Sequence, residues 1–76
     1  MPVTSSQLKT LRKKFGYTQA NAADVVRVTR RTWMSWELSE NTENYRVMPE
    51  GLIELFCLKH KIDYKVIDGK VHIVYI

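Results

Sequence analysis

Residues 18–37 carry two helix signals in close succession. The segment reads Thr18-Gln19-Ala20-Asn21-Ala22-Ala23-Asp24-Val25-Val26-Arg27-Val28-Thr29-Arg30-Arg31-Thr32-Trp33-Met34-Ser35-Trp36-Glu37. Thr18 and Thr29 can each cap a helix, because a threonine hydroxyl accepts a hydrogen bond from a free backbone N–H group of the first turn. The pattern predicts helices over about residues 19–26 and 30–38, joined by a tight turn.

The second of these predicted helices has two unlike faces. At about 100° per residue, Trp33 and Trp36 share one arc with Thr32. The opposite arc carries Arg30, Arg31, Met34 and Ser35. The small side chains of Ala22 and Ala23 allow the preceding helix to approach closely. We therefore expect the tryptophans in the core and the opposite arc free for contact with a partner.

A helix is predicted on each side of this pair. Thr4 and Gln7 match a capping box, apolar residues follow at helical spacing, and Gly16 can end the helix in the left-handed conformation. Pro49 fits the first turn of a helix that ends near Lys61, since its missing N–H has no partner there. The polar residues 39–44, which lack periodicity, are expected to form a loop.

The tail changes to the period of a β-strand. Asp68-Gly69 separates two β-branched runs, which is a strong signal for a two-residue hairpin turn. The expected register opposes Ile67 to Lys70, Val66 to Val71 and Tyr64 to Ile73. Because the last strand has no proline and only one formal charge, its open edge is expected to attract another chain.

These signals predict a mainly α fold: a four-helix helix-turn-helix domain over residues 1–61, followed by a C-terminal β-hairpin over residues 62–76. A chain of 76 residues holds one small core of marginal stability. The single cysteine, Cys57, excludes an internal disulfide and a Cys-rich zinc site. Oligomerisation is then the remaining source of stability. The hairpin is the expected dimerisation element, through Val71, Ile73, Val74, Tyr75 and Ile76.

The positive charge is concentrated in the first half of the chain. The whole chain has a net charge of +4, whereas residues 1–37 hold seven basic and two acidic residues. Such a distribution is compatible with a polyanionic partner. No apolar run approaches the roughly 20 residues that cross a bilayer, and no signal-peptide pattern opens the sequence. We therefore expect a soluble intracellular protein with no membrane partner.

Taken together, residues 18–37 resemble the helix-turn-helix of the Cro/repressor-like (XRE-type) DNA-binding family. The shared features are the opening Thr18-Gln19, the small Ala23 at the helix crossing, Val28 in the turn, the Thr29 cap and the closing Trp36-Glu37. The resemblance extends over about residues 6–60. One departure is Arg27, which stands where the family usually has glycine, and a left-handed non-glycine residue costs about 1–2 kcal/mol.

The resemblance implies specific roles for residues of this chain. Arg30 and Arg31 match the first exposed positions of a recognition helix, where arginine can bind guanine through two hydrogen bonds. Thr29, Met34 and Ser35 are weaker candidates for contacts to bases. Gln19 matches a residue that binds a phosphate group. The remaining expected phosphate contacts come from Thr18 and from cations that flank the motif: Arg27, Arg46, Lys13 and Lys14.

Less specific interpretations exist for most of these residues. The two arginines can be a solvated pair, and the lysines of the first helix can form an ordinary solvated face. The tryptophans can stack on bases, although their spacing favours the core. Glu37 is expected to bind loop backbone rather than DNA. His60, His72 and Cys57 lack a second ligand at metal spacing, and no nucleophile, acid pair or phosphate-binding loop is present, so we expect neither a metal, a cofactor nor catalysis.

The predicted function is a sequence-specific regulator of transcription that binds double-stranded DNA. The resemblance implies a homodimeric repressor that occludes a promoter at a palindromic operator. It also implies a phage or mobile-element protein in the cytoplasm of a bacterial cell or phage-infected host, with autoregulation in the manner of phage Cro-like or anti-CRISPR-associated regulators. The alternative is an antitoxin or other protein-binding module whose hairpin edge binds a protein partner.

Overall fold

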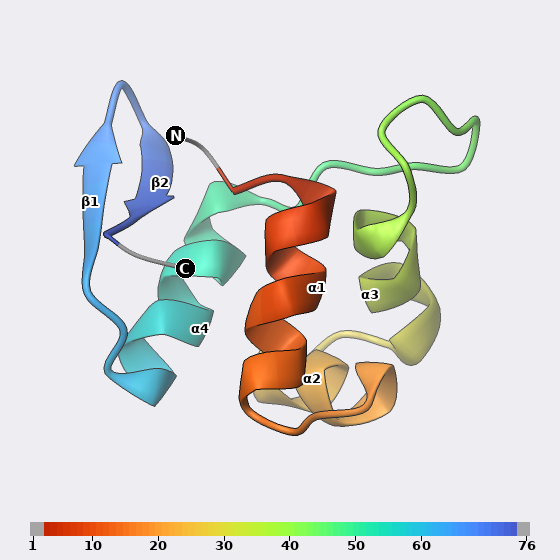
Figure 1. The fold of residues 1–76 in the computed structure, drawn as a ribbon, viewed down its shortest axis with the longest axis horizontal. Coiled ribbons are helices and arrows are strands. Elements are labelled where there is room, and N and C mark those ends of the chain that lie inside the picture. The colour runs from red at the N-terminus through yellow and green to blue at the C-terminus, as the bar shows by residue number, and fades with distance from the viewer. Residues whose placement is uncertain (1–2, 75–76) are drawn as a thin grey trace.

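The computed structural model describes residues 3–74 and has the predicted mainly α architecture (Figure 1). Four helices precede one antiparallel hairpin: α1 (Ser5–Lys14), α2 (Gln19–Val25), α3 (Arg30–Glu37), α4 (Glu50–His60), β1 (Tyr64–Ile67) and β2 (Lys70–Ile73). Tyr75 and Ile76, which were expected to take part in dimerisation, lie outside the described residues.

Threonine side chains start the first three helices, as the sequence predicted. The hydroxyls of Thr4, Thr18 and Thr29 accept hydrogen bonds from backbone N–H groups three residues further on, at 3.1, 3.1 and 3.2 Å. Thr4 and Gln7 form a complete capping box, since the Gln7 side chain also accepts from the backbone of Thr4. Pro49 lies at the cap of α4 rather than inside its first turn, so this helix begins one residue later than expected.

The core lies between the four helices and the hairpin. Its largest fully buried side chains are those of Trp33 from α3 and Phe56 from α4. Ala22 and Ala23 of α2 are completely covered, and their small size permits the close contact between α2 and α3. The inward orientation predicted for Trp33 and Trp36 is confirmed, so neither ring is available to stack on bases.

The turn between α2 and α3 has the left-handed residue that the resemblance implied. Arg27 occupies that position with φ +63°. The next residue, Val28, donates its backbone N–H to the carbonyl of Ala23 at 3.0 Å, and Lys59 Nζ donates to the carbonyl of Val25 at 2.6 Å. The turn therefore keeps its left-handed geometry without glycine, and hydrogen bonds on either side of Arg27 hold it in place.

The connection from α3 to α4 is a long polar loop that projects from the helices (Figure 1). Two internal turns order it, with hydrogen bonds from Thr42 N to Ser39 O at 2.9 Å and from Tyr45 N to Thr42 O at 3.1 Å. Arg46 N then donates to the carbonyl of Ser35 at 3.2 Å. The far end of the loop is thus fastened to α3.

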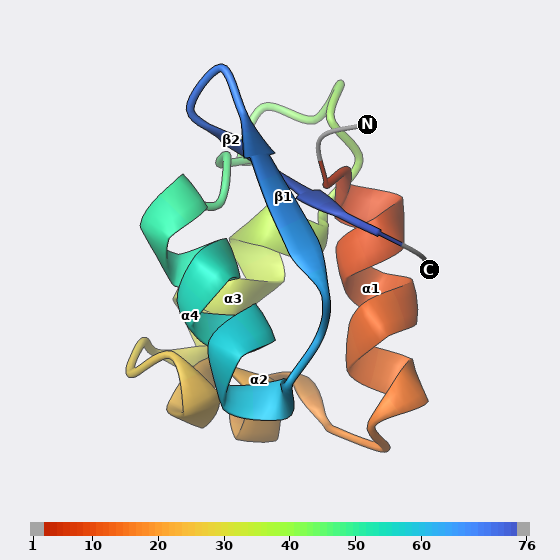
Figure 2. The same cartoon turned by 90° about the vertical axis from the view of Figure 1, so that its left-hand side faces the viewer.

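The hairpin has the predicted register, with Val66 opposite Val71. Asp68 and Gly69 both have positive φ, as a type I′ turn requires. Figures 1 and 2 show the hairpin beside α4, on the side of the molecule away from α3. Val71 is only 2% exposed, and its backbone N–H donates to Glu50 Oε1 of α4. Two expectations need correction: Val71 belongs to the protomer's own core rather than to a dimer surface, and the edge of β2 is partly occupied.

Candidate nucleic-acid interface

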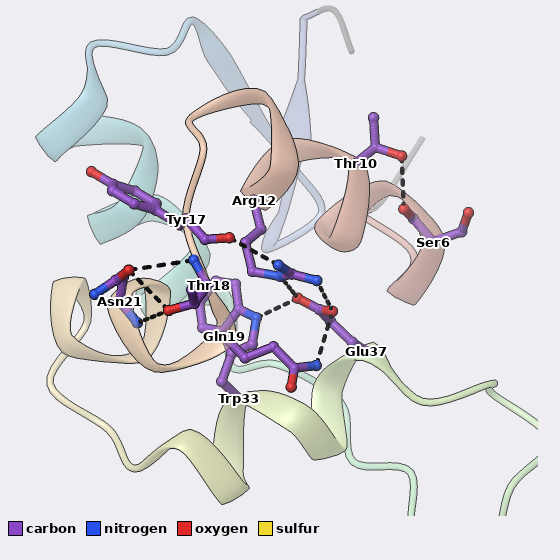
Figure 3. Close-up of polar contacts among 9 residues, drawn as sticks. All are labelled: Ser6, Thr10, Arg12, Tyr17, Thr18, Gln19, Asn21, Trp33 and Glu37. Atoms are coloured by element: carbon purple, nitrogen blue, oxygen red, sulfur yellow. Dashed lines mark hydrogen bonds and ion pairs between the residues drawn. The ribbon is translucent and has the colours of Figure 1, made fainter.

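A buried carboxylate fixes α3 against the two preceding helices (Figure 3). Glu37, at the end of α3, has a side chain that is only 4% exposed. It accepts two hydrogen bonds from the Arg12 guanidinium of α1, at 2.6 and 3.0 Å. It also accepts from the Trp33 indole at 2.5 Å and from the Gln19 amide of α2 at 3.3 Å. One side chain therefore determines the position of three helices.

The ionised form of Glu37 is the form that this arrangement stabilises. Burial alone would raise the pKa of the carboxyl group, but the hydrogen bonds from Arg12, Trp33 and Gln19 outweigh it and lower the pKa. Glu37 was expected to bind loop backbone, and the structure corrects this, since its partners are side chains. Sequence reasoning missed Arg12, although its spacing of four residues from buried Leu8 places it beside the apolar face of α1.

The exposed side of α3 carries the two arginines assigned to base reading. Arg30 and Arg31 lie in its first turn and are exposed. Within residues 3–74, neither side chain forms a hydrogen bond or ion pair. Met34 and Ser35 are half-buried one turn further along. The predicted free face of α3 therefore exists, and its cationic groups have no partner in the described chain.

The hydroxyls near these arginines are already engaged. Ser35 Oγ donates to the carbonyl of Thr32 at 2.6 Å, and Thr29 Oγ1 donates to Thr32 Oγ1 at 3.0 Å. Both oxygens can still accept a hydrogen bond, for example from a base amino group. The methyl group of Thr29 remains available for apolar contact because the residue is exposed.

A hollow of about 530 Å³ separates α3 from the loop that follows it. Its lining contains Arg31, Thr32, Met34, Ser35, Leu38, Asn44 and Arg46. Arg46 is held there because its Nη1 donates to the carbonyls of Tyr45 and Glu43 at 2.9 and 3.3 Å. The structure thus brings Arg46 together with three predicted base-reading residues. Asn44 was not predicted, since the loop has no periodicity that would show which side chains turn toward α3.

The other expected phosphate contacts are more dispersed. Gln19 stands at the start of α2, but its amide already donates to Glu37. The Thr18 hydroxyl donates to Asn21 Oδ1 at 2.9 Å, so its proton is engaged within the chain. Arg27 is exposed in the turn between α2 and α3. Lys13 and Lys14 are exposed at the end of α1 and do not line the hollow beside α3.

The other side chains that could take part in chemistry are hydrogen-bonded within the protein or buried. The hydroxyl of Tyr17 and Nε2 of His60 lie 2.8 Å apart, inside an aromatic cluster that includes Phe15 and Phe56. Burial, with a smaller contribution from Glu54, raises the pKa of the Cys57 thiol to about 11. Among residues 3–74, no group of three His, Cys, Asp or Glu side chains is arranged to hold a metal ion. The same residues include no helix with the length and apolar character needed to cross a membrane.

No protein-family model matches this chain, and searches of curated proteins and of solved structures found no match.

Proposed function

We propose that the protein is a sequence-specific regulator of transcription that binds double-stranded DNA through a helix-turn-helix of the Cro/repressor-like family. One observation carries this proposal. Arg30 and Arg31 are exposed and have no partner among residues 3–74, on a short helix whose opposite side is fixed in the core by Trp33 and Glu37. This is the combination that base reading requires, namely free donors on a rigid support.

The physical basis is the fit of a helix to the major groove. The groove is wide enough to admit an α-helix, and an arginine there can donate two hydrogen bonds to O6 and N7 of guanine. Each good pair discriminates against other bases by about 1–3 kcal/mol. We therefore expect guanines opposite Arg30 and Arg31, with weaker base contacts from Thr29, Met34 and Ser35.

Contacts to the DNA backbone would set the register of α3. Arg46 flanks the exposed face of α3 beside the hollow, and Arg27 lies in the preceding turn. Cations at these places bind phosphate regardless of sequence and release counterions, so they contribute affinity that falls with salt. The excess of basic residues in residues 1–37, which include Arg27, supports contact with a polyanion.

We infer repression by occlusion as the mode of action. Occlusion requires only that the bound protein cover the promoter, which the small domain formed by residues 3–74 would do. The proposed protein is a cytoplasmic homodimer without cofactor or catalysis. It binds a palindromic operator whose half-sites lie about 34 Å apart, one turn of DNA. By the same family resemblance, it belongs to a phage or mobile element and regulates its own operon.

The test is selection of bound duplexes from a randomised DNA library at about 0.15 M salt, where nonspecific attraction is weakened. We expect enrichment of an inverted repeat with guanines in each half. Selection that leaves the library unenriched would refute sequence-specific recognition.

Two matched variants test whether α3 is the element that recognises the DNA bases. Arg31→Ala and Lys70→Ala each remove one exposed positive charge, the first from α3 and the second from the hairpin. We expect Arg31→Ala to lose about 5- to 150-fold in affinity for the selected site and little for random DNA. Lys70→Ala should change both only slightly. Equal losses on the two DNAs for Arg31→Ala would contradict base reading.

A second function is favoured by one observation. Val66 and Ile67 of β1 are 56% and 49% exposed, and an exposed apolar strand edge is a common site of protein contact. An antitoxin or other protein-binding module would use this edge for a different protein. Such a module would be monomeric when purified alone, whereas the proposed repressor would be a dimer.

A further inference from the structure

The hollow beside α3 has two walls of different chemistry. One wall belongs to α3 and its end, where Met34 and Leu38 are four residues apart and therefore neighbours, and both are half-buried. The other wall is the loop that follows α3, with Asn44 and Arg46. Arg31, in the first turn of α3, lines the same hollow. The proposed guanine contact is therefore next to an apolar wall and a polar wall.

The carboxamide of Asn44 has no partner in the described chain. The residue is exposed, and its side chain forms no hydrogen bond within residues 3–74. Both residues that follow it are fixed by backbone hydrogen bonds. Tyr45 N donates to the carbonyl of Thr42 at 3.1 Å, and Arg46 N donates to the carbonyl of Ser35 at 3.2 Å. An unused donor and an unused acceptor are thus held beside α3 on an ordered segment.

The two polar residues of the loop wall suit different parts of DNA. Arg46 carries a charge and is suited to a phosphate group, which binds cations regardless of sequence. The Asn44 amide is uncharged and adds little to that attraction. It offers an N–H donor and a carbonyl acceptor side by side, which is the pattern that recognises a base edge. Asn44 is therefore better suited to bases than to the DNA backbone.

We propose that this hollow receives the major-groove edge of one A·T base pair, next to the guanine bound by Arg31. Adenine presents an acceptor at N7 beside a donor at N6, and thymine presents O4 and its C5 methyl group. The Asn44 amide donates to N7 and its carbonyl accepts from N6. Met34 and Leu38 contact the thymine methyl group. Each wall of the hollow thus recognises one base of the pair.

Other base pairs leave one wall without a suitable partner. A G·C pair presents two acceptors, N7 and O6, so the amide carbonyl of Asn44 finds no donor, and its cytosine has no methyl group. A reversed T·A pair places the methyl group against Asn44 and the polar adenine edge against Met34 and Leu38. The arrangement therefore selects both the base pair and its orientation.

The size and place of the hollow agree with this occupant. Its volume of about 530 Å³ is much larger than one methyl group needs and lies in the range of sites that take up whole organic groups. Figure 1 shows the loop beyond the end of α3, on the side of the molecule away from the hairpin. The inference deepens the proposed function and rests on it, because a base edge reaches the hollow only when α3 lies in the major groove.

The first test changes single groups of the DNA and leaves the protein unaltered. In the site selected from the randomised library, 7-deazaadenine removes the N7 acceptor of the A·T pair and uracil removes the thymine methyl group. By fluorescence anisotropy at about 0.15 M salt, we expect binding to weaken about 2- to 10-fold with 7-deazaadenine and about 4-fold with uracil. The same replacements at an A·T pair outside the half-sites are the control and should leave the affinity unchanged.

The outcomes separate this inference from the proposed function. A selected site without an A·T pair beside the guanine would overturn the inference and leave sequence-specific binding intact. So would a replacement at that pair that has no more effect than its control. A library that stays unenriched would refute both.

The second test assigns the adenine to Asn44. Asn41 is the matched control, because it is an exposed asparagine of the same loop that does not line the hollow. We expect Asn44→Ala to bind the selected site about 5- to 150-fold more weakly and to lose the distinction between adenine and 7-deazaadenine. Asn41→Ala should keep both the affinity and the distinction. A distinction that persists in Asn44→Ala, or an equal loss on selected and random DNA, would overturn the proposal.

Discussion

Replacing Glu37 with glutamine tests whether the buried carboxylate holds the three helices together. The substitution preserves the shape of the side chain and removes its charge. Glutamine keeps one acceptor oxygen, but it also directs an NH2 group toward the donors of Arg12, Trp33 and Gln19. Arg12, whose side chain is 11% exposed, is then left charged without its carboxylate.

The expected loss of stability follows from this burial. Removing one partner of a buried ion pair costs about 3–5 kcal/mol. Arg12 keeps a hydrogen bond to the carbonyl of Tyr17 at 2.9 Å and is not fully covered, so the lower end applies, about 3 kcal/mol. A chain of 76 residues has a free energy of unfolding of about 4–11 kcal/mol. The substitution should therefore remove between a quarter and three quarters of the stability.

Urea denaturation at neutral pH, followed by tryptophan fluorescence and circular dichroism, measures this loss. The matched control is Glu43→Gln, which removes the same charge from an exposed loop residue. Its free energy of unfolding should stay within about 0.5 kcal/mol of the wild-type value. A loss below about 1 kcal/mol for Glu37→Gln would refute the reasoning, as would equal losses for both variants.

Two further predictions concern pH and the left-handed turn. Because the pKa of folded Glu37 lies below its ordinary value of 4.5, the carboxylate stabilises the protein fully above that pH and loses its contribution as the pH falls through the folded pKa. The difference in unfolding free energy between the wild type and Glu37→Gln should thus shrink on acidification below 4.5, and a constant difference would contradict it. Arg27→Gly should raise the free energy of unfolding by about 0.5–1 kcal/mol, because glycine relieves the strain at φ +63° but has more freedom when unfolded. Thermal unfolding measures this change, and a lower midpoint for the variant would show that the turn is unstrained.

The features that the sequence predicted correctly are local. Thr4, Thr18 and Thr29 cap helices because their partners are three residues away. The hairpin register follows from Asp68-Gly69, since a two-residue turn leaves one pairing of the flanking strands. In both cases the decisive interaction lies within one turn or one pair of strands, where residue spacing alone determines which groups meet.

The features that the sequence did not predict join distant parts of the chain. Arg12 and Glu37 are 25 residues apart, and Val71 and Glu50 are 21 apart. Each carboxylate had other cations or N–H groups as candidate partners, and only the packing of the helices selects among them. The second contact explains why the edge of β2 is partly occupied.

In the candidate interface, too, the sequence predicted the local features but not the contacts between distant segments. The exposure of Arg30 and Arg31 follows from the helical period and the inward tryptophans. The place of Arg46 and Asn44 in the hollow depends on how an aperiodic loop returns to α3. Helical periodicity carries information about a face of a helix, but none about the path of a loop.

The choice of capping residue links folding stability to the proposed interface. Helices α1, α2 and α3 have no acidic residue in their first turns, whereas α4, next to the hairpin, has Glu50. A carboxylate in the first turn stabilises a helix by about 0.3–1 kcal/mol. At the start of α3 it would also repel DNA phosphates beside Arg30 and Arg31. Under the proposed function, the neutral start of α3 gives up this stabilisation and stays compatible with a polyanion. Variants selected only for heat resistance would be expected to acquire acidic residues at these helix starts and to lose affinity for DNA as they do so.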